Sequence, residues 1–523
     1  MKNIHGLLLV GCSAVALAGC GPSDISAPGT GGDVIITNPT PTPTPAPTGG
    51  TGNVTPASGC PTIADPQGLA DAGTITGPTG TWRVCSLPSR INASITLQKV
   101  PGLLYQLPGR VDVGTDGGAT ATTDSNVTLT IQPGVIVFGG TGVSWLHVNR
   151  GNKINAVGTA TAPIIFTSRD NVLGLNTESS SGQWGGVVLS GRAPITDCTI
   201  APNATPGSAQ CERQTEGAVD PAIYGGTDPA YNAGKLSYVQ IRYSGYVLSG
   251  NSELQALTLQ GVGTGTQLDH IQSHNSSDDA MEAFGGRVNM KYFIATGAED
   301  DVLDTDTGVK ANIQYVISVQ RAGVGDASIE ADSDNAVDGN TPRQNTKVAN
   351  FTFIQNSNTG SDLAAILLRG GTDYSLVNGV VVSPNYTCLR VSRAQTASGT
   401  ADAAIDEAGA PFFRSVAMQC GTPKYLGANS VTDAQVQALF GAGSNNNSDT
   451  LTSTLSSVYV NGANENAIPG FDAKTLNSFF DTTTYIGAVR NAQDTWYAGW
   501  TCNSGTASFG TGNSGLCSSL PLT

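Results

Sequence analysis

The 523-residue chain is poor in charge and in histidine, and it lacks the short motifs of several common enzyme classes. Only 12% of its residues are charged, against about 25% in an average soluble protein. It has no Gly-x-Ser-x-Gly sequence and no Walker-type lysine, which argues against an α/β-hydrolase and a P-loop enzyme. The glycine-rich run 261–265 precedes no helical pattern, and we interpret it as a turn.

Metal-binding patterns built from cysteine or histidine are also missing. The chain has 10 cysteines but no Cys-x-x-Cys pair. Beyond the N-terminal leader its histidines are His147, His270 and His274. The last two lie in a strand-and-turn pattern and so do not share the face of a helix, on which residues four apart lie one above the other. A zinc site is therefore not predicted.

The formal net charge is −15 at pH 7, which makes nucleic acid and anionic lipid surfaces unfavourable electrostatic partners. Cations or a basic protein fit an acidic surface better, although an acidic balance also serves solubility on its own. We therefore expect no nucleic-acid partner.

The first 19 residues have the features of a secretory signal peptide, with a lysine followed by an apolar run and small residues. They lead into Leu17-Ala18-Gly19-Cys20, which resembles the bacterial lipobox, where the cysteine becomes the acylated N-terminus. Glycine rather than aspartate follows, and by resemblance to enterobacterial sorting this favours the outer membrane. We predict lipidation of Cys20, the lipid bilayer as a partner, and a lipid-anchored protein on the cell-surface or periplasmic face of the outer membrane.

The next segment alternates proline and threonine, from Asn38 to Pro47. This pattern predicts polyproline II, a semi-rigid spacer of about 3.1 Å per residue. Residues 20–58 are therefore predicted to hold the folded part away from the bilayer.

The cysteines indicate an oxidising compartment. Setting aside Cys12 and Cys20 leaves an even number, which in an exported chain predicts disulfides. The order alone leaves many connectivities open, and pairing neighbours in sequence is the simplest because it closes the shortest loops. The predicted pairs are Cys60–Cys85, Cys198–Cys211, Cys388–Cys420 and Cys502–Cys517.

The body of the chain is a series of short apolar runs separated by glycine, asparagine or proline. Examples are 127–131, 135–139, 163–168 and 184–191. No helix-period pattern appears among these runs, which excludes a doubly wound sheet with crossover helices. A β-sandwich and a parallel β-helix remain as candidates.

An acidic repeat favours the β-helix. Asp278 and Asp300 are separated by 22 positions, as are Glu282 and Asp304, and a looser third copy contains Glu330. A period near 22 suits one coil of a parallel β-helix, in which equivalent side chains stack at about 4.8 Å. Glu282, Asp304 and Glu330 are therefore predicted to form a column.

The predicted fold is an all-β, right-handed parallel β-helix with N- and C-terminal caps and a few short helical insertions. The predicted boundaries are a signal peptide at 1–19, a lipidated, Pro/Thr-rich tether at 20–58, an N-terminal cap at 59–124, the β-helix at 125–400, and helical insertions with a C-terminal cap at 401–523.

Carboxylates stacked this closely cannot all stay ionised without a counter-charge or a cation. Oxygen ligands from several acidic residues suit Ca²⁺, although no complete EF-hand loop is present. A solvated acidic face with lysine or arginine partners explains the repeat equally well. The candidate metal ligands are Asp278, Asp279, Glu282, Asp300, Asp301, Asp304, Asp306, Glu330 and Asp332.

A polar residue also recurs at one place in successive coils, and stacked polar side chains satisfy one another's hydrogen bonds. The predicted structural column is Ser237, Asp269, Asn289, Asn312, Asn350 and Asn378.

The C-terminal part departs from the strand pattern. Residues 402–407 and 432–440 are predicted to be helical, the second with Thr432 as N-cap and Gly441 as its C-terminal stop. The aromatic residues of the tail, 479–500, are predicted to plug the last coil, with a sugar-stacking platform as the alternative.

Several segments resemble a known group. Residues 184–195, Phe284-Gly285-Gly286, and the tail segments 485–488 and 498–501 are similar to a largely uncharacterised family of secreted β-helix lipoproteins of Gram-negative bacteria. More remotely, the chain resembles the pectate-lyase-like β-helix superfamily, which includes pectin-degrading enzymes. The resemblance implies a fold and a location at the cell surface rather than an activity.

Enzymes of that superfamily suggest two tests of the sequence. A polygalacturonase-like site combines paired aspartates with Gly-His-Gly and Arg-x-Lys; the pairs are here in 278–279 and 300–301, but the other motifs are not. A lyase-like site uses Ca²⁺ and a basic residue, for which Arg369 is the candidate, although Arg369 also suits a counter-ion of the acidic column.

We therefore expect a monomeric, outer-membrane-anchored surface lipoprotein with a non-enzymatic binding or structural role, towards glycans or an outer-membrane partner protein. The alternative is a polysaccharide lyase or glycoside hydrolase that acts through the acidic column.

Overall fold

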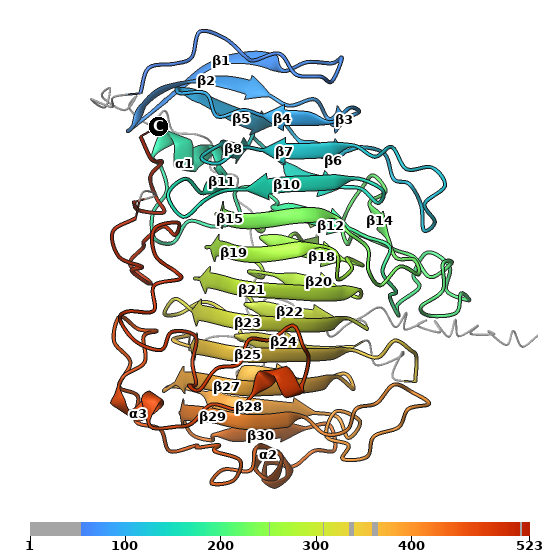
Figure 1. The fold of residues 1–523 in the computed structure, drawn as a ribbon, viewed down its shortest axis with the longest axis vertical. Coiled ribbons are helices and arrows are strands. Elements are labelled where there is room, and N and C mark those ends of the chain that lie inside the picture. Colours follow the sequence, from blue (N-terminus) through green and yellow to red (C-terminus); the bar gives the residue numbers. More distant parts are fainter. Residues whose placement is uncertain are drawn as a thin grey trace, which may run out of the picture.

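The computed structural model describes residues 54–249, 252–306, 308–333, 339–357, 364–512 and 515–522. The predicted signal peptide, Cys20 and most of the predicted tether lie outside these residues. Within them, no helix combines the length and the apolar character that a membrane span requires. The chain winds into a tall stack of strands, with the first coils at the top of Figure 1 and the later coils below.

Two sheets of the described chain build this stack, and we refer to them as the long sheet and the short sheet. The long sheet contains β1 (Ala70–Gly77), β2 (Gly80–Ser86), β4 (Ile95–Leu97), β5 (Leu103–Leu107), β7 (Thr128–Ile131), β8 (Ile136–Gly139), β10 (Lys153–Val157), β11 (Ile164–Ser168), β15 (Gly234–Arg242), β19 (Gln267–His274), β21 (Arg287–Thr296), β23 (Lys310–Val319), β25 (Asn345–Ile354), β27 (Asp373–Ser383) and β29 (Phe412–Cys420). The short sheet contains β3 (Arg90–Ile91), β6 (Arg110–Val113), β9 (Trp145–Val148), β12 (Val187–Ser190), β18 (Leu257–Gln260), β20 (Glu282–Phe284), β22 (Leu303–Asp306), β24 (Ile329–Ala331), β26 (Ala364–Leu368), β28 (Thr387–Ser392) and β30 (Tyr425–Ala428).

Successive coils pair in parallel, and from β15 onward each coil gives one strand to each sheet. The apolar side chains of every second position meet inside the coil, where they form one continuous core. This confirms the predicted parallel β-helix. Parallel pairing begins with β2 and β5 and continues to β28 and β30, so the coils extend past both ends of the range 125–400.

The long strands bend at a residue with positive φ. This residue is Tyr238 in β15, His270 in β19, Tyr292 in β21 and Tyr315 in β23, and the later strands have Asn350, Asn378 and Ser415 there. The predicted polar column is therefore correct only in pairs. Ser237 pairs with Asp269, and Asn289 with Asn312, in direct register with a side-chain hydrogen bond in each pair. It is wrong between these pairs, because Asp269 pairs with Lys291 and Asn312 with Lys347. It is correct for Asn350 and Asn378, whose neighbours pair in the same register.

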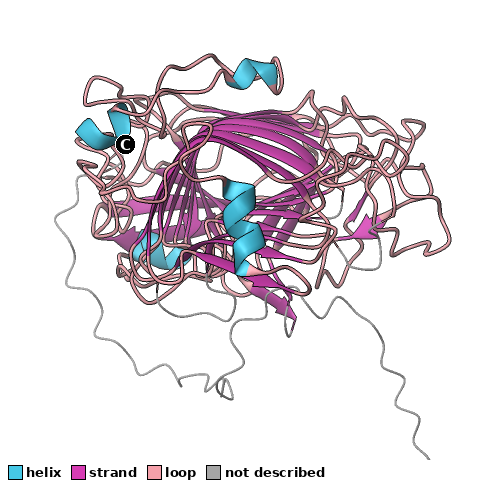
Figure 2. Cartoon of the chain, turned by 90° about the horizontal axis from the view of Figure 1, so that it is seen from below, coloured by secondary structure: helices cyan, strands magenta, loops and turns pink. Residues whose placement is uncertain are grey.

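Each open end of the stack is covered by a different element. At the start, β1 pairs antiparallel with β2. At the other end, α2 (Asp433–Phe440) lies across the last coil, as Figure 2 shows from below. Its Thr432 capping box and left-handed Gly441 confirm the predicted helix ends. Phe440 of this helix packs against Phe413 and Tyr425 at ring-centroid distances of 5.6 and 5.8 Å.

The predicted helix at 402–407 is wrong. Asp402 and Glu407 pair through their backbones as a short antiparallel bridge. The Asp402 side chain accepts a hydrogen bond of 2.9 Å from the backbone N–H of Ala404. Such local bonds from aspartate favour turns over helices.

The tail does not plug the last coil, because α2 already covers it. After α2 the chain runs back along the outside of the long sheet, through α3 (Ala463–Asn466) and the 3₁₀ turn Ala473–Thr475, towards the first coils (Figure 1). Trp500 is buried against Tyr238, and Leu520 packs in a cluster with Trp82. The tail therefore fastens the late coils to the early ones.

The four predicted disulfides are present, which confirms the pairing of neighbours. Cys198–Cys211 closes a loop within a long insertion after β12, which contains β13 (Arg213–Gln214) and β14 (Ile223–Tyr224). A hairpin of β16 (Val247–Ser249) and β17 (Ser252–Glu253) follows β15, and α1 (Arg169–Leu173) follows β11. The insertion and the hairpin lie at the outer face of the short sheet, where the candidate site is found.

Candidate functional site

The acidic repeat forms a column on the outer face of the short sheet. β20, β22 and β24 pair Glu282 with Asp304 and Asp304 with Glu330 in direct register. Their neighbours Leu303 and Ile329 point into the core, so alternation sends the acidic side chains outward. The 22-residue spacing thus predicted the register correctly.

A second set of carboxylates lies in the turns that precede these strands. Asp279 accepts a hydrogen bond of 2.9 Å from the backbone N–H of Asp301, and Asp301 accepts one of 2.6 Å from the N–H of Ala327. Each turn is thereby bonded to the turn of the next coil. These bonds hold the side chains of the turns beside the column.

The two sets meet in two overlapping groups. Asp278, Asp279 and Asp300 place carboxylate oxygens within 4.8 Å of one another, and so do Asp279, Glu282 and Asp304. Asp279 belongs to both groups and is only 4% exposed, while Glu282 is 5% exposed. We refer to Asp278, Asp279, Glu282, Asp300, Asp301 and Asp304 as the acidic cluster.

The acidic cluster has no basic partner within the described part of the chain: no lysine, arginine or histidine nitrogen there lies within 4.0 Å of its carboxylates. Gln255 donates a hydrogen bond of 3.1 Å to Asp278. Among the same residues, Glu282 has no hydrogen-bond donor, and Oδ1 of Asp304 is buried without one. Buried carboxylate oxygens without donors are costly.

The other three predicted ligands differ, because arginines neutralise them. Arg369 forms ion pairs with Glu330 and with Asp332, the latter at 3.4 Å. Arg213 approaches Asp306 at 3.8 Å and pairs with Asp197 at 2.9 Å. Of the two roles considered for Arg369, the geometry matches the counter-ion.

The electrostatic environment of the acidic cluster opposes ionisation. Burial, followed by the carboxylate of Glu253, raises the pKa of Asp278 to about 7. Burial and the neighbouring carboxylates raise the pKa of Asp279, Glu282 and Asp304 well above the usual range. The pKa of Asp300 and Asp301 is raised in the same way. The fully ionised cluster at neutral pH therefore calls for positive charge from outside the chain.

The chemistry of the donors suits a hard divalent cation. All six side chains offer carboxylate oxygens, the ligands that Ca²⁺ and Mg²⁺ prefer. Oxygens within 4.8 Å of one another can share one ion, since Ca²⁺–oxygen distances are about 2.3–2.6 Å. Two groups that share Asp279 offer room for one bridged pair of ions or for a single ion between them.

The N-terminal half of the same face contains a constellation that the sequence analysis missed. Nδ1 of His147 lies 2.8 Å from Oδ1 of Asp112, and Nε2 of His147 lies 2.9 Å from Oγ of Ser190. This is the order of acid, base and hydroxyl found in hydrolases. His147 and Ser190 are both 0% exposed, and Thr215 of the insertion donates to Gln260 beside Ser190. As arranged, the network is closed to any substrate and links three coils.

The aromatic residues at the bend form a stack rather than an open platform. The ring centroids of Tyr238, His270, Tyr292 and Tyr315 follow one another at 4.2, 4.4 and 4.8 Å. Because the rings face each other, their flat surfaces are occupied, and Trp500 packs edge-on against the first two. A sugar that stacks on ring faces finds little free face here.

In a comparison with protein-family models, residues 117–501 match a pectate-lyase-like beta helix domain. No curated protein and no solved structure matches the chain.

Proposed function

The chain belongs to the family of pectate-lyase-like β-helix domains, and from this premise we propose that it is a non-enzymatic, calcium-dependent glycan-binding protein of the cell surface. The observation that supports the calcium is the acidic cluster, in which buried carboxylates lack a basic partner among the described residues. A β-helix of this family is compatible with a carbohydrate-related role at a surface.

In this proposal Ca²⁺ has a structural role. It neutralises carboxylates from two successive coils. In this way it takes the part that arginines play for Glu330, which is one coil further along, and for Asp306, which lies on the same strand as Asp304. The cation would be held by Asp278, Asp279, Glu282, Asp300 and Asp304, with Asp301 fixed by its bond to Ala327. The other predicted ligands, Asp306, Glu330 and Asp332, would stay with their arginines.

Burial and pairing favour binding over catalysis. A catalytic carboxylate must touch the glycosidic bond, but Glu282 and Glu330 are only 5% and 3% exposed. A lyase needs a basic residue to remove a proton, and Arg369 is engaged by Glu330 and Asp332.

One observation favours the alternative, a polysaccharide lyase or glycoside hydrolase. The pKa of Asp278 is raised to about 7 by burial and by Glu253, and such a carboxyl group is suited to act as a general acid near neutral pH. Asp300 lies beside it as a second carboxylate. This pairing keeps the enzymatic function testable.

We also propose that the protein is anchored to the outer membrane through acylated Cys20, with residues 20–58 as a stalk. The lipobox-like sequence and the four disulfides, which are typical of exported proteins, support this. Labelling with radioactive palmitate, compared between the natural chain and Cys20→Ala, tests the anchor. Equal labelling of both would contradict it.

The binding function is tested by calorimetric titration of Ca²⁺ into chelator-treated protein and by a panel of acidic and neutral polysaccharides assayed for both binding and cleavage. We expect Ca²⁺ binding that Asp279→Asn weakens at least about tenfold, because this residue belongs to both oxygen groups. We expect polysaccharide binding without cleavage. Cleavage that is lost in Asp300→Ala would replace the proposal by the enzymatic alternative.

A further inference from the structure

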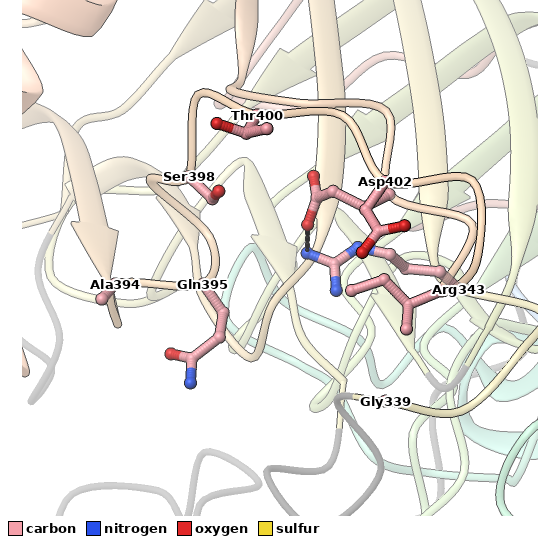
Figure 3. A pocket seen from close by; sticks show the side chains of 9 residues that line it. Gly339, Arg343, Ala394, Gln395, Ser398, Thr400 and Asp402 are labelled. Atoms are coloured by element: carbon pink, nitrogen blue, oxygen red, sulfur yellow. Dashed lines mark ion pairs between the residues drawn. The ribbon is translucent and has the colours of Figure 1, made fainter.

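A cavity separate from the acidic cluster opens beside the later coils, between the segment before β25 and the long loop after β28 (Figure 3). Its volume is about 560 Å³, within the range of about 300–1,000 Å³ that is usual for small-molecule sites. In Figure 3, Ser398 and Gln395 lie on one side of it, and Asp402 and Arg343 on the other. Gly339, Ala394, Thr400, Ile405 and Glu407 complete the lining.

The floor of the cavity is a fixed ionic cluster. The guanidinium of Arg343 is paired with Glu407 and, at 3.2 Å, with Asp373, and all three side chains are buried. The carboxylates are held in turn, since Asp373 accepts from the N–H of Ala408 at 3.0 Å and Glu407 from that of Gly409 at 2.9 Å. The loop that forms one wall is thereby bonded to the floor, so the cavity is preorganised.

The walls offer neutral hydrogen-bonding groups. The side chains of Gln395, Ser398 and Thr400 line the cavity and make no hydrogen bond to any other described residue. Ile405 and Ala394 add small apolar surfaces. Because Arg343 is already paired with two carboxylates and Asp402 adds a third, an anionic ligand gains little here.

We propose that this cavity binds a neutral saccharide of one or two rings. Hydroxyl and amide groups on the wall match sugar hydroxyls, carboxylate oxygens of Asp402 and Glu407 accept from them, and Ile405 meets a C–H face of the ring. This inference rests on the proposed glycan-binding function and gives it a site and a ligand class. It places sugar recognition at the corner loops and not at the acidic cluster.

The test uses the full-length protein and saturation-transfer NMR with methyl α-mannoside, methyl β-glucoside and cellobiose, alongside glucuronic acid and glucosamine as charged probes. Ser398→Trp fills the cavity, and Gln395→Ala removes one donor from an exposed position. Ala403→Trp, on an exposed position of the same loop that does not line the cavity, is the matched control. Circular dichroism verifies that each variant is folded.

We expect a neutral probe to bind the natural chain and Ala403→Trp alike, with affinity about tenfold lower in Gln395→Ala and no detectable signal in Ser398→Trp. Neutral probes that bind Ser398→Trp normally would overturn the cavity as the site while leaving glycan binding intact. A preference for the charged probes would overturn the ligand class. If no probe binds although polysaccharides do, the inference fails and the proposed function stands; if neither binds, both fail.

Discussion

The two halves of the outer face of the short sheet both carry polar side chains that are shielded from solvent, but they satisfy them differently. In the N-terminal half, Asp112 accepts hydrogen bonds from Arg110, His147 and Asn149 at 2.8–3.1 Å. Burial opposes its ionisation, but the bonds and charges of His147 and Arg110 outweigh burial and lower the pKa of Asp112 to about 2. In the C-terminal half, burial and the carboxylate of Glu253 raise the pKa of Asp278 to about 7, and no basic side chain among the described residues pairs with it.

The difference shows that burial alone does not decide the charge of a carboxylate in this fold. The stacked geometry is the same, and what changes from one half to the other is whether the chain supplies a cation of its own. Where arginine and histidine are present, the polar network is complete and holds coils together. Where they are missing among the described residues, an ion from solution is the remaining source of positive charge, and the acidic cluster is such a place.

The largest expected effect on stability comes from breaking the polar network around Asp112 in the N-terminal half. Asp112→Ala leaves the buried His147 and the half-buried Arg110 without their carboxylate, and removing one partner of a buried ionic network costs about 3–5 kcal/mol of unfolding free energy. Urea denaturation followed by circular dichroism measures this. Asp71→Ala, which breaks a solvent-exposed pair with Arg83, is the control and should leave the transition nearly unchanged. Equal effects of the two substitutions would show that the network around Asp112 contributes no more to stability than an exposed ion pair does.

Removing calcium should have the next largest effect, because it leaves the carboxylates of the acidic cluster without positive charge. If free Ca²⁺ is present at about 1,000 times its dissociation constant, binding adds about 4 kcal/mol to the unfolding free energy. Scanning calorimetry in Ca²⁺ and in chelator should show a midpoint several degrees lower in chelator. Mg²⁺, which needs a more regular geometry and keeps its waters, should restore less. The same midpoint in both buffers would rule out a tightly bound ion.

Substitutions within the column should have opposite signs in the two environments. In the calcium-free protein near pH 8, Glu282→Gln removes one of several unpaired carboxylates and should raise the unfolding free energy by about 1–2 kcal/mol. Glu330 lies on the strand next to Asp304, and Glu330→Gln should lower the unfolding free energy because Arg369 loses a partner. Calorimetry in chelator compares them. A loss of stability in both variants would contradict the claim that Glu282 lacks a partner.

Much of the fold could be predicted from the sequence wherever the signal was local or periodic. The constant spacing of Glu282 and Asp304 fixed the register of β20 and β22, and the cysteine order predicted every disulfide. Thr432 and Gly441 marked the ends of α2 because capping depends on a few adjacent residues.

The residues with positive φ at which the long strands bend could not be predicted in this way. Left-handed backbone is usual for asparagine but uncommon for tyrosine and histidine, so Asn350 and Asn378 were found while Tyr238 and His270 were not. The tail was misjudged because its contacts join Trp500 to residues more than 200 positions earlier, for which no local pattern exists.

The candidate site was predicted in part for the same reason. Its carboxylates repeat at equal spacing, but their partners do not. The repeat therefore does not distinguish Glu330, which has Arg369, from Glu282, which has no basic partner among the described residues. Asp112, His147 and Ser190 are spaced by 35 and 43 positions, because loops of unequal length separate their strands. Polar residues at alternate positions of three apolar strands were the one available signal.

The smallest expected effect is the pH dependence of the calcium-free protein, and its sign separates the two halves. Asp278 has a folded-state pKa raised to about 7, whereas in the unfolded chain an aspartate ionises near about 3.9. The stability that it contributes is therefore complete below about pH 4 and is lost as the pH rises through about 7.

Asp112 behaves in the opposite way, since its pKa is lowered to about 2, so its contribution is lost only as the pH falls below about 4. Between about pH 6 and about pH 7 Asp112 adds no slope. His147 and His274 make the stability rise with pH there, because burial lowers their pKa while the unfolded histidines lose their protons near about pH 6.5. Asp278 has the opposite sign and costs about 1 kcal/mol per pH unit. Burial and Asp373 raise the pKa of Glu407 to about 7, so Glu407 makes the stability fall with pH in the same way as Asp278. Asp278→Asn distinguishes the two contributions, because it removes only that of the acidic cluster. Calorimetry in chelator should show that raising the pH lowers the midpoint of the natural chain relative to that of Asp278→Asn. Ca²⁺ should reduce this difference, because the cation binds the deprotonated cluster. Parallel midpoint curves for the natural chain and Asp278→Asn in chelator would mean that the chain itself stabilises the charged form of Asp278.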